Sequence, residues 1–516
     1  MLSVRSRPNE STALLGGPKS HNSGRAWVLL TLIVACGLFL RTYDLALNSL
    51  WLDELYSLKM ATVTDLSAWR GDAHPPLYYL LLKGWVSFSA GDWWVRFLSV
   101  VFGTATIPVV YLISAKIFSR RVGLAASLLM AILSLHVAYS QEARMYTVLV
   151  FFFALGLLGV AQAALKNRKS GWVLMFCGSI GAAYSHGIGP LYSALILCFY
   201  PVMAWVHGRR PNWIFWLTTC VIVAVLYVPW ALNLMQLTQS GQMVFWEKQP
   251  SWTRLLTHIQ ELGLADIPAL SSVLNNYLSL QLPETPKFLW QIPIVIGVAL
   301  IVLLRHDRKL LLSLMALYLV PILVVFLVSL ARTPIYGARI ILPACLPLVI
   351  VLGAAVDLKR PFVRIGYIIF GFTATLLLIG SFYYLRYHPA KEQWREALAY
   401  ISESAQAEDA IIFNVDGPSM FILDRYGSSL KSKSVEIRAY TQNTEACGGT
   451  VKTCLDGMVS TLASTGEYWF VNSHEEFVAG AASIKDWKLE RMKCESPKSF
   501  IGLTLDKCRA AGPASD

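Results

Sequence analysis

Residues 145–165 read MYTVLVFFFALGLLGVAQAAL, an apolar run without a charged side chain. A helix of about 20 such residues spans the hydrocarbon core of a bilayer. Further apolar runs of similar length follow one another along the chain, so the sequence predicts about eleven transmembrane helices. We place these helices at 26–44, 95–117, 122–139, 145–165, 170–187, 189–206, 213–232, 287–304, 310–330, 340–356 and 364–385.

The composition agrees with a membrane protein. Of the 516 residues, 55% are hydrophobic and only 15% are charged, whereas a soluble domain carries about 25% charged residues. This difference excludes an ordinary soluble enzyme and a disordered protein. The net charge of +12 could suit nucleic acid, but the basic residues stand between the apolar runs. The sequence therefore predicts a polytopic α-helical membrane protein with membrane lipids, and no nucleic acid, as partners.

Basic residues in the connecting segments indicate the orientation, because cytoplasmic loops carry an excess of Lys and Arg. They concentrate in alternate connections, at 116–121, 166–169, 209–210, 305–309 and 359–364. The N-terminus is then cytoplasmic. We expect a disordered leader at 1–25, a transmembrane domain at 26–385 and, after an odd number of crossings, a soluble extracytoplasmic domain at 386–516.

The cysteines support this orientation. Of the 9, all but four lie in apolar runs, where a buried small hydrophobic side chain is expected. The others, Cys447, Cys454, Cys494 and Cys508, lie in the C-terminal segment and indicate two disulfides in an oxidising compartment. Proximity favours Cys447–Cys454 and Cys494–Cys508, although three pairings are open. A zinc site is the alternative, but the spacing does not match paired CxxC ligands.

Two predicted extracytoplasmic loops are longer than simple connections. The first, at 45–94, contains short amphipathic stretches at Leu50–Thr62 and Pro76–Ser89, and we expect the second of them to be a helix at the membrane interface. The second, at 233–286, mixes aromatic and polar residues and could cover a site as a lid. In the C-terminal segment, AIIFNV and EYWFVN are expected strands. Trp394, Leu398 and Ile401 lie at helical spacing, so this segment is predicted to be a small α/β domain.

Candidate catalytic carboxylates lie in the first of these loops. Asp53 and Glu54 are adjacent in an apolar stretch. Neighbouring helical residues point about 100° apart, so one carboxylate can face a cavity while the other turns elsewhere. Such a carboxylate could act as general base for a hydroxyl nucleophile or hold a cation. The alternatives are an acid at the N-terminus of a helix and a solvated pair of acids in the loop.

Cationic side chains recur at the same predicted face. His74 precedes two prolines, and Arg144 and Arg339 stand at the starts of spans, where a guanidinium can bind phosphate. Lys83 and Arg96 could also contact an anionic headgroup, or could simply extend to the interface. If YSQEARMY is helical, its residues Tyr139, Glu142 and Tyr146 share one face. No Walker A, GxGxxG, HExxH or GxSxG motif occurs, which argues against a nucleotide-driven reaction.

An ordered set of motifs then resembles a known family. These are LWLDELYSL at 50–58, HPPLYYLLL at 74–82, WVRFLSVVFG at 94–103, RRVGLAASLLMA at 120–131 and YSQEARMY at 139–146. Together they resemble the bacterial family-39 glycosyltransferases of the GT-C superfold, which are similar to protein O-mannosyltransferases and to the aminoarabinose and galacturonosyl transferases of lipid A. The resemblance is weaker at IYGARIILPACLPL and at EQWREALAYI, which is similar to the start of that family's periplasmic domain.

The resemblance implies an inverting transferase in the bacterial inner membrane that uses a polyprenyl-phosphate sugar. It implies Asp53, with Glu54 beside it, as the base or acceptor-positioning carboxylate. His74, Arg96, Arg144 and Arg339 would hold the donor phosphate, and Glu142 would orient the acceptor or Arg144. From their positions in the sequence we add Lys83 to the phosphate-binding residues, and Tyr139 and Tyr146 to those that orient the acceptor. A divalent metal is left open, because no clean ligand set is visible.

The sugar and the acceptor stay open. The acceptor is expected to be an envelope lipid, a glycan or a protein. The alternative functions are a non-catalytic lipid-linked sugar flippase or polysaccharide exporter, and a receptor-like membrane protein. The first would not need the acidic pair and would usually show repeat symmetry. The second would not need the cluster of arginines.

Overall fold

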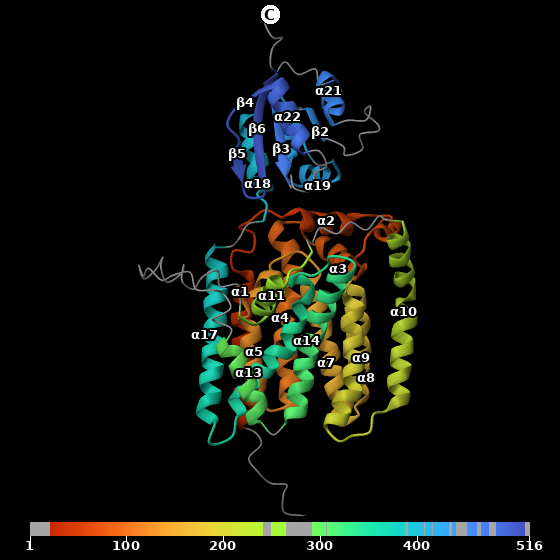
Figure 1. Ribbon diagram of the computed structural model, residues 1–516, viewed down its shortest axis with the longest axis vertical. Coiled ribbons are helices and arrows are strands. Elements are labelled where there is room, and N and C mark those ends of the chain that lie inside the picture. Colours follow the sequence, from red (N-terminus) through yellow and green to blue (C-terminus); the bar gives the residue numbers. More distant parts are fainter. Residues whose placement is uncertain are drawn as a thin grey trace, which may run out of the picture.

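Long helices run side by side between two ends of a bundle, and a small α/β domain stands on one of these ends (Figure 1). The computed structural model describes most of the chain. The described residues are 21–240, 249–264, 292–305, 307–387, 391–406, 408–414, 416–432, 436–439, 451–461, 466–473 and 481–510. Most of the predicted leader and much of the predicted lid at 233–286 lie outside them.

The bundle confirms the predicted helical membrane fold. Its helices are α1 (His21–Thr42), α4 (Asp92–Ile117), α5 (Arg120–Ala131), α6 (Ser134–Ser140), α7 (Tyr146–Lys166), α8 (Lys169–Ser185), α9 (Gly189–Val206), α10 (Trp213–Gln239), α13 (Ile292–Leu304), α14 (Arg308–Ala331), α15 (Ala338–Ile341), α16 (Cys345–Gly353) and α17 (Val363–Tyr387). Among the described residues, 8 helices are long and apolar enough to cross a membrane, or 9 if a bent pair counts as one span. The span Ala338–Asp357 contains α15, α16 and two short 3₁₀ turns.

Helix lies within each of the eleven predicted spans, as far as the structure describes them, but only 8 or 9 of them are long and apolar enough to cross a membrane. Within the described residues, α8 and α13 have 17 and 13 residues, somewhat short for a full crossing. α1 begins at His21, inside the predicted leader. The polar residues of this first turn escape a search for apolar runs because the start of a helix does not need to be buried.

A buried arginine explains the break in one predicted span. α5 and α6 are bent by 59°, and a break of this kind leaves the last carbonyls of α5 without partners in the helix. Arg41, at the end of α1, is fully buried and donates to the carbonyl oxygens of Met130 and Ala131 and to Nδ1 of His136. These bonds give the carbonyl groups at the end of α5 hydrogen-bond partners and fix α1 against α5 and α6.

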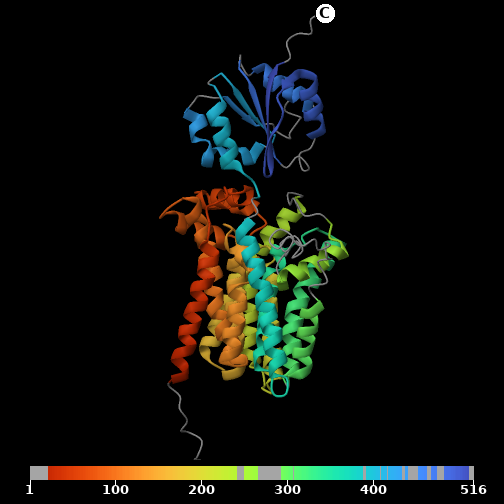
Figure 2. The same cartoon turned by 90° about the vertical axis from the view of Figure 1, so that its left-hand side faces the viewer.

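Short helices form a layer across the end of the bundle that faces the α/β domain (Figure 2). They are α2 (Leu52–Thr62), the 3₁₀ helix η1 (Leu66–Gly71) and α3 (Leu77–Val86). α2 and α3 are the two amphipathic stretches of the first loop, and α3 confirms the predicted helix. The buried tyrosines Tyr78 and Tyr79 anchor α3 in the core, so the layer has a defined position above the spans. α11 (Trp252–Leu264) lies at the same end of the bundle (Figure 1).

The C-terminal domain is the predicted α/β fold. Its strand order is β2-β1-β3-β6-β4, and β5 also pairs with β6. β1 is parallel to β2 and β3, whereas β6 is antiparallel to its neighbours. The elements are α18 (Trp394–Ser404), β1 (Ala410–Phe413), α19 (Asp416–Tyr426), α20 (Ser428–Ser432), β2 (Glu436–Ala439), α21 (Val451–Thr461), β3 (Tyr468–Ser473), α22 (Ala481–Arg491), β4 (Met492–Cys494), β5 (Lys498–Phe500) and β6 (Leu503–Ala510).

Both faces of this sheet are covered because its strands alternate side chains between two cores. Ile411 and Trp469 share one core with Leu398 of α18, while Ile412 shares the other with Trp487 of α22. Cys494 and Cys508 form a disulfide across β4 and β6. Cys454 is buried in the second core, and its expected partner Cys447 lies outside the described residues.

Candidate active site

The adjacent carboxylates of α2 have different surroundings. Glu54 is fully buried, and its Oε1 accepts a hydrogen bond of 2.7 Å from the backbone N–H of Ala143. Both of its oxygens also accept from Arg96, at 2.6 and 2.8 Å. Glu54 thus joins α2, α4 and the segment after α6.

Arg96 has no donor left for a phosphate. Besides the two bonds to Glu54, it donates to the carbonyl oxygens of Leu45 and Asn48, at 2.9 and 2.8 Å, and of Ser49 at 2.9 Å. A guanidinium has five N–H groups, and all of them are used here. This arrangement favours a structural role, in which Arg96 holds the chain just before α2.

Asp53 instead faces two arginines from other parts of the bundle. Its Oδ2 lies 3.8 Å from Nη2 of Arg144 and 3.7 Å from Nη1 of Arg339, and its side chain is 36% exposed. Arg144 is held in place by bonds of 3.1 Å to the Asp53 carbonyl and 2.9 Å to the Ser57 hydroxyl. Although burial opposes it, the Asp53 carboxylate raises the pKa of Arg144 well above its ordinary value. The three side chains place a partly exposed carboxylate between two cations.

Two histidines lie beside these cations. The rings of His74 and His186 are 4.5 Å apart. Burial, with the charges of Arg144 and Arg339, lowers the pKa of His74 to about 3. Burial, then His74 and the same arginines, lowers the pKa of His186 well below its ordinary value. Nδ1 of each ring accepts a backbone N–H, from Gly187 and Ile188 respectively. Each ring is therefore neutral, with its proton on Nε2.

Asp72 fixes the turn that carries His74. It is buried and accepts from the His74 backbone N–H at 2.9 Å and from the Tyr79 hydroxyl at 2.5 Å. Burial raises the pKa of Asp72, against the effect of these donors. The two prolines after His74 exclude a continuous helix there, so this aspartate determines where the imidazole is presented.

The segment YSQEARMY is not one helix. α6 ends at Ser140 and α7 begins at Tyr146, so the premise for a shared face of Tyr139, Glu142 and Tyr146 is wrong. The turn lets the Ala143 N–H reach Glu54 and directs Arg144 towards Asp53. Tyr139 and Tyr146 still meet, with ring centroids 5.1 Å apart, and Tyr146 lies 5.8 Å from His186.

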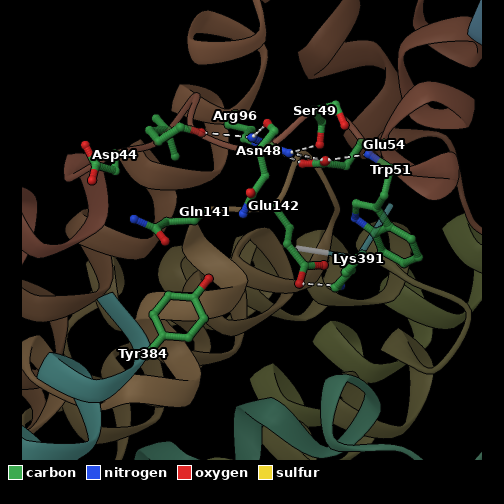
Figure 3. Close-up of a pocket in the computed structure, with 11 residues that line it drawn as sticks. Asp44, Asn48, Ser49, Trp51, Glu54, Arg96, Gln141, Glu142, Tyr384 and Lys391 are labelled. Carbon is green, nitrogen blue, oxygen red and sulfur yellow. Dashed lines mark hydrogen bonds and ion pairs between the residues drawn. The ribbon is translucent and has the colours of Figure 1, made fainter. Parts of the chain in front are cut away.

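Glu142 belongs to a separate pocket behind the acidic pair. Its Oε1 accepts from Nζ of Lys391 at 2.6 Å. Figure 3 shows the two side chains pointing toward one another, with Glu54 and Arg96 joined nearby. The pocket is small, with a cavity volume of about 50 Å³. It is lined by Asp44, Leu45, Asn48, Ser49, Trp51, Glu54, Arg96, Gln141, Glu142, Tyr384 and Lys391.

Lys83 lies in neither group. Its Nζ donates to the carbonyl oxygen of Val63 at 2.7 Å, next to the end of α2, and the residue is exposed. The predicted residues therefore divide into three sets. Asp53, His74, Arg144 and Arg339 meet; Glu54, Arg96 and Glu142 surround the pocket; and Lys83 ties α3 to α2.

Comparisons with known proteins agree with this architecture. Residues 73–232 match the family model of dolichyl-phosphate-mannose-protein mannosyltransferases. The fold is similar to ArnT from Cupriavidus metallidurans in the apo state, with a TM-score of 0.59 and 13% identity over 94% of this chain and 98% of that one. The same protein bound to undecaprenyl phosphate gives a TM-score of 0.54 with the same identity and coverage.

The apo oligosaccharyltransferase of Archaeoglobus fulgidus gives a TM-score of 0.52 and 11% identity over 97% of this chain and 76% of that one. No curated protein matches the chain in sequence. The matched family segment contains His74, Arg96, Arg144 and His186, and the shared fold extends over nearly the whole chain.

The chain is a glycosyltransferase with the GT-C fold.

Sequence reasoning missed three residues at the site of this glycosyltransferase. Asp72 has a visible signal, since an Asp two residues before a restrained His suggests a local turn. His186 lies far along the sequence from His74, and only the fold brings the two rings together. Lys391 lies far along the sequence from Glu142, so no local pattern could pair them. Among the described residues, no group of three or more His, Cys, Asp or Glu side chains could hold a metal ion.

Proposed function

We propose that this glycosyltransferase moves a sugar from a polyprenyl-phosphate-linked donor to a hydroxyl group of an acceptor. The observation that carries the proposal is the carboxylate of Asp53 between Arg144 and Arg339, at 3.8 and 3.7 Å. One similar structure is that of ArnT with undecaprenyl phosphate bound, which supports a lipid-phosphate donor for this chain.

The proposed reaction is a single displacement. The acceptor oxygen attacks the anomeric carbon as its proton passes to Asp53, and the bond from that carbon to the phosphate oxygen breaks. The configuration at the anomeric carbon is therefore inverted. The departing polyprenyl phosphate carries negative charge, which Arg144 and Arg339 would stabilise. His74 and His186, neutral because of their surroundings, would donate hydrogen bonds from Nε2 and add no charge.

We also propose that the site faces the periplasm of a bacterial inner membrane, with the N-terminus in the cytoplasm. Two observations support this orientation. The basic connections between spans lie at the end of the bundle away from the α/β domain, as the positive-inside rule requires. The disulfide Cys494–Cys508 is typical of an oxidising compartment. Catalysis then belongs to 26–385, with 386–516 outside the membrane.

A transfer assay tests the proposal. Membranes containing the wild type or Asp53→Asn at equal amounts would receive polyprenyl-phosphate sugars labelled in the sugar, with Mn²⁺ or with a chelator. Label would be followed into lipid, glycan and protein fractions. Transfer by the wild type alone supports the proposal and identifies the acceptor class. Movement of intact donor between leaflets, without transfer, would contradict it and favour a flippase.

A further inference from the structure

The helix that carries Asp53 is capped only in part by its own residues, since Oε2 of Glu54 accepts the Trp51 N–H at 3.2 Å. The N-cap position of α2 is Trp51, with extended backbone and no side-chain cap, whereas Ser, Thr, Asp and Asn are strongly preferred there. The first N–H groups of a helix have no partner inside it. Asp53 is the second residue of α2, so its position depends on how this first turn is held.

Groups from the C-terminal part of the chain bind the first N–H of α2 and the two residues just before its N-cap. The Leu52 N–H donates to Oε2 of Glu392 at 2.8 Å, and the Leu50 N–H donates to the Tyr426 hydroxyl oxygen at 2.8 Å. The Ser49 hydroxyl donates to the Glu392 carbonyl oxygen, also at 2.8 Å. Glu392 is 2% exposed and also accepts the indole N–H of Trp394. It is therefore a buried, fixed acceptor.

The same part of the chain is anchored to the bundle around this cap. Tyr426 donates to Oδ2 of Asp92 at 2.9 Å, and Arg425 pairs with the same carboxylate at the start of α4. Lys391, next to Glu392, pairs with Glu142 and lies over the Trp51 ring at 3.8 Å. The capping groups are thus held relative to α4 and to the segment that carries Arg144.

We propose that Glu392 is a positioning residue, which caps α2 from the C-terminal part of the chain and thereby holds Asp53 between Arg144 and Arg339. This inference rests on the proposed function of Asp53 as base. It assigns the α/β domain a part in catalysis without contact with the substrate. Loss of the cap frays the first turn of α2, which displaces the Asp53 carboxylate relative to Arg144 and Arg339, while the Ser57 hydroxyl still holds Arg144.

The test compares Glu392→Ala with Glu392→Gln in the full-length protein in membranes. Gln keeps a side-chain oxygen that can accept the Leu52 N–H, whereas Ala removes it. Hydrogen exchange of the peptide covering 50–58 would report the cap directly, and we expect it to be about tenfold faster in Glu392→Ala. Lys431→Ala is the control, because Lys431 pairs with Asp424 on the exposed surface of the same domain.

The kinetic result separates positioning from a general structural effect. For Glu392→Ala we expect kcat to fall about tenfold while the KM for the donor stays nearly constant, and Glu392→Gln should recover most of the kcat. An unchanged rate of hydrogen exchange at 50–58 in Glu392→Ala would show that Glu392 does not cap α2. Faster exchange with wild-type kcat would overturn the positioning role. An equal loss of kcat in Gln and Ala would also overturn it, because the charge and not the cap would then matter.

A second variant tests the cap if Glu392→Ala is unstable. If Glu392→Ala does not accumulate, Tyr426→Phe takes its place, since it removes the acceptor of the Leu50 N–H together with the bond to Asp92 and leaves Glu392 intact. Faster exchange with lower kcat supports the inference, and no change in either overturns it. If exchange rises as expected but the wild type transfers no sugar from any donor, the cap is supported and the proposed function fails.

Discussion

Asp53 and Glu54 are consecutive residues, yet one is 36% exposed beside two arginines and the other is fully buried against Arg96. The buried carboxylate accepts from two backbone N–H groups and from the guanidinium, so its capacity is taken up by structure. The exposed one has only longer contacts with Arg144 and Arg339 and can still accept a proton. Of the two neighbours, Glu54 therefore stabilises the structure and Asp53 is available for the chemistry.

Glu54→Ala should destabilise the protein rather than act on the chemistry alone. Breaking a buried ion pair by removing one partner costs about 3–5 kcal/mol, because the Arg96 charge would stay buried without Glu54. Thermal unfolding in detergent should show a clearly lower Tm. Asp424→Ala, which removes an exposed pair, is the control and should change little. An unchanged Tm in Glu54→Ala would contradict the structural role.

Arg339→Gln should weaken binding of the donor phosphate. An Arg–phosphate contact is a charge-assisted hydrogen bond and contributes about 1.5–3 kcal/mol, so affinity for a polyprenyl phosphate should fall at least about tenfold. Arg332→Gln is a matched control, because Arg332 is exposed at the end of α14. Equal affinities in titrations of the two variants would rule out Arg339 as a phosphate ligand.

Acid should destabilise the protein through His74. Its pKa is about 3 in the folded protein, because of burial and the nearby arginines, and about 6.5 when unfolded. Between these values the unfolded chain binds a proton that the folded protein does not, so stability rises with pH across this window and falls on acidification. The effect of this one group is about 2 kcal/mol at pH 5.

The measurement is Tm between pH 5 and 7 for the wild type, His74→Asn and the control His207→Asn. His207 lies at the far end of α9. The loss of Tm toward pH 5 should be smaller in His74→Asn than in the other two proteins. Identical pH profiles for all three would show that His74 does not carry this linkage.

Much of the fold follows from apolar runs, which the chain must bury in lipid or in the bundle. Helices lie within all the predicted spans, although only 8 or 9 of the described ones are long and apolar enough to cross a membrane. The two helices of the first loop and the two predicted C-terminal strands are found. The bend between α5 and α6 was not predicted, because it depends on Arg41, which reaches it from α1. Such a contact leaves no periodic signal in either segment.

The residue types at the site could be predicted from the sequence. Which of these residues meet at Asp53, and which are engaged by structural partners, could not. Asp53, His74, Arg144 and Arg339 come together as the motifs suggest. The sequence around the pair does not show which of Asp53 and Glu54 is buried, because both are acidic residues in the same apolar helix. Arg96 and Glu142 carry suitable charges for a phosphate or an acceptor, but Glu54 and Lys391, distant along the chain, engage them.

The most direct test of the central claim is sugar transfer by Asp53→Asn, measured together with its Tm in one preparation. We expect a Tm close to that of the wild type, because Asp53 is partly exposed and its ion pairs are long. We expect kcat to fall by about 100-fold or more, because a general base is lost. Wild-type kcat in a folded Asp53→Asn would contradict the assignment of Asp53 as the base.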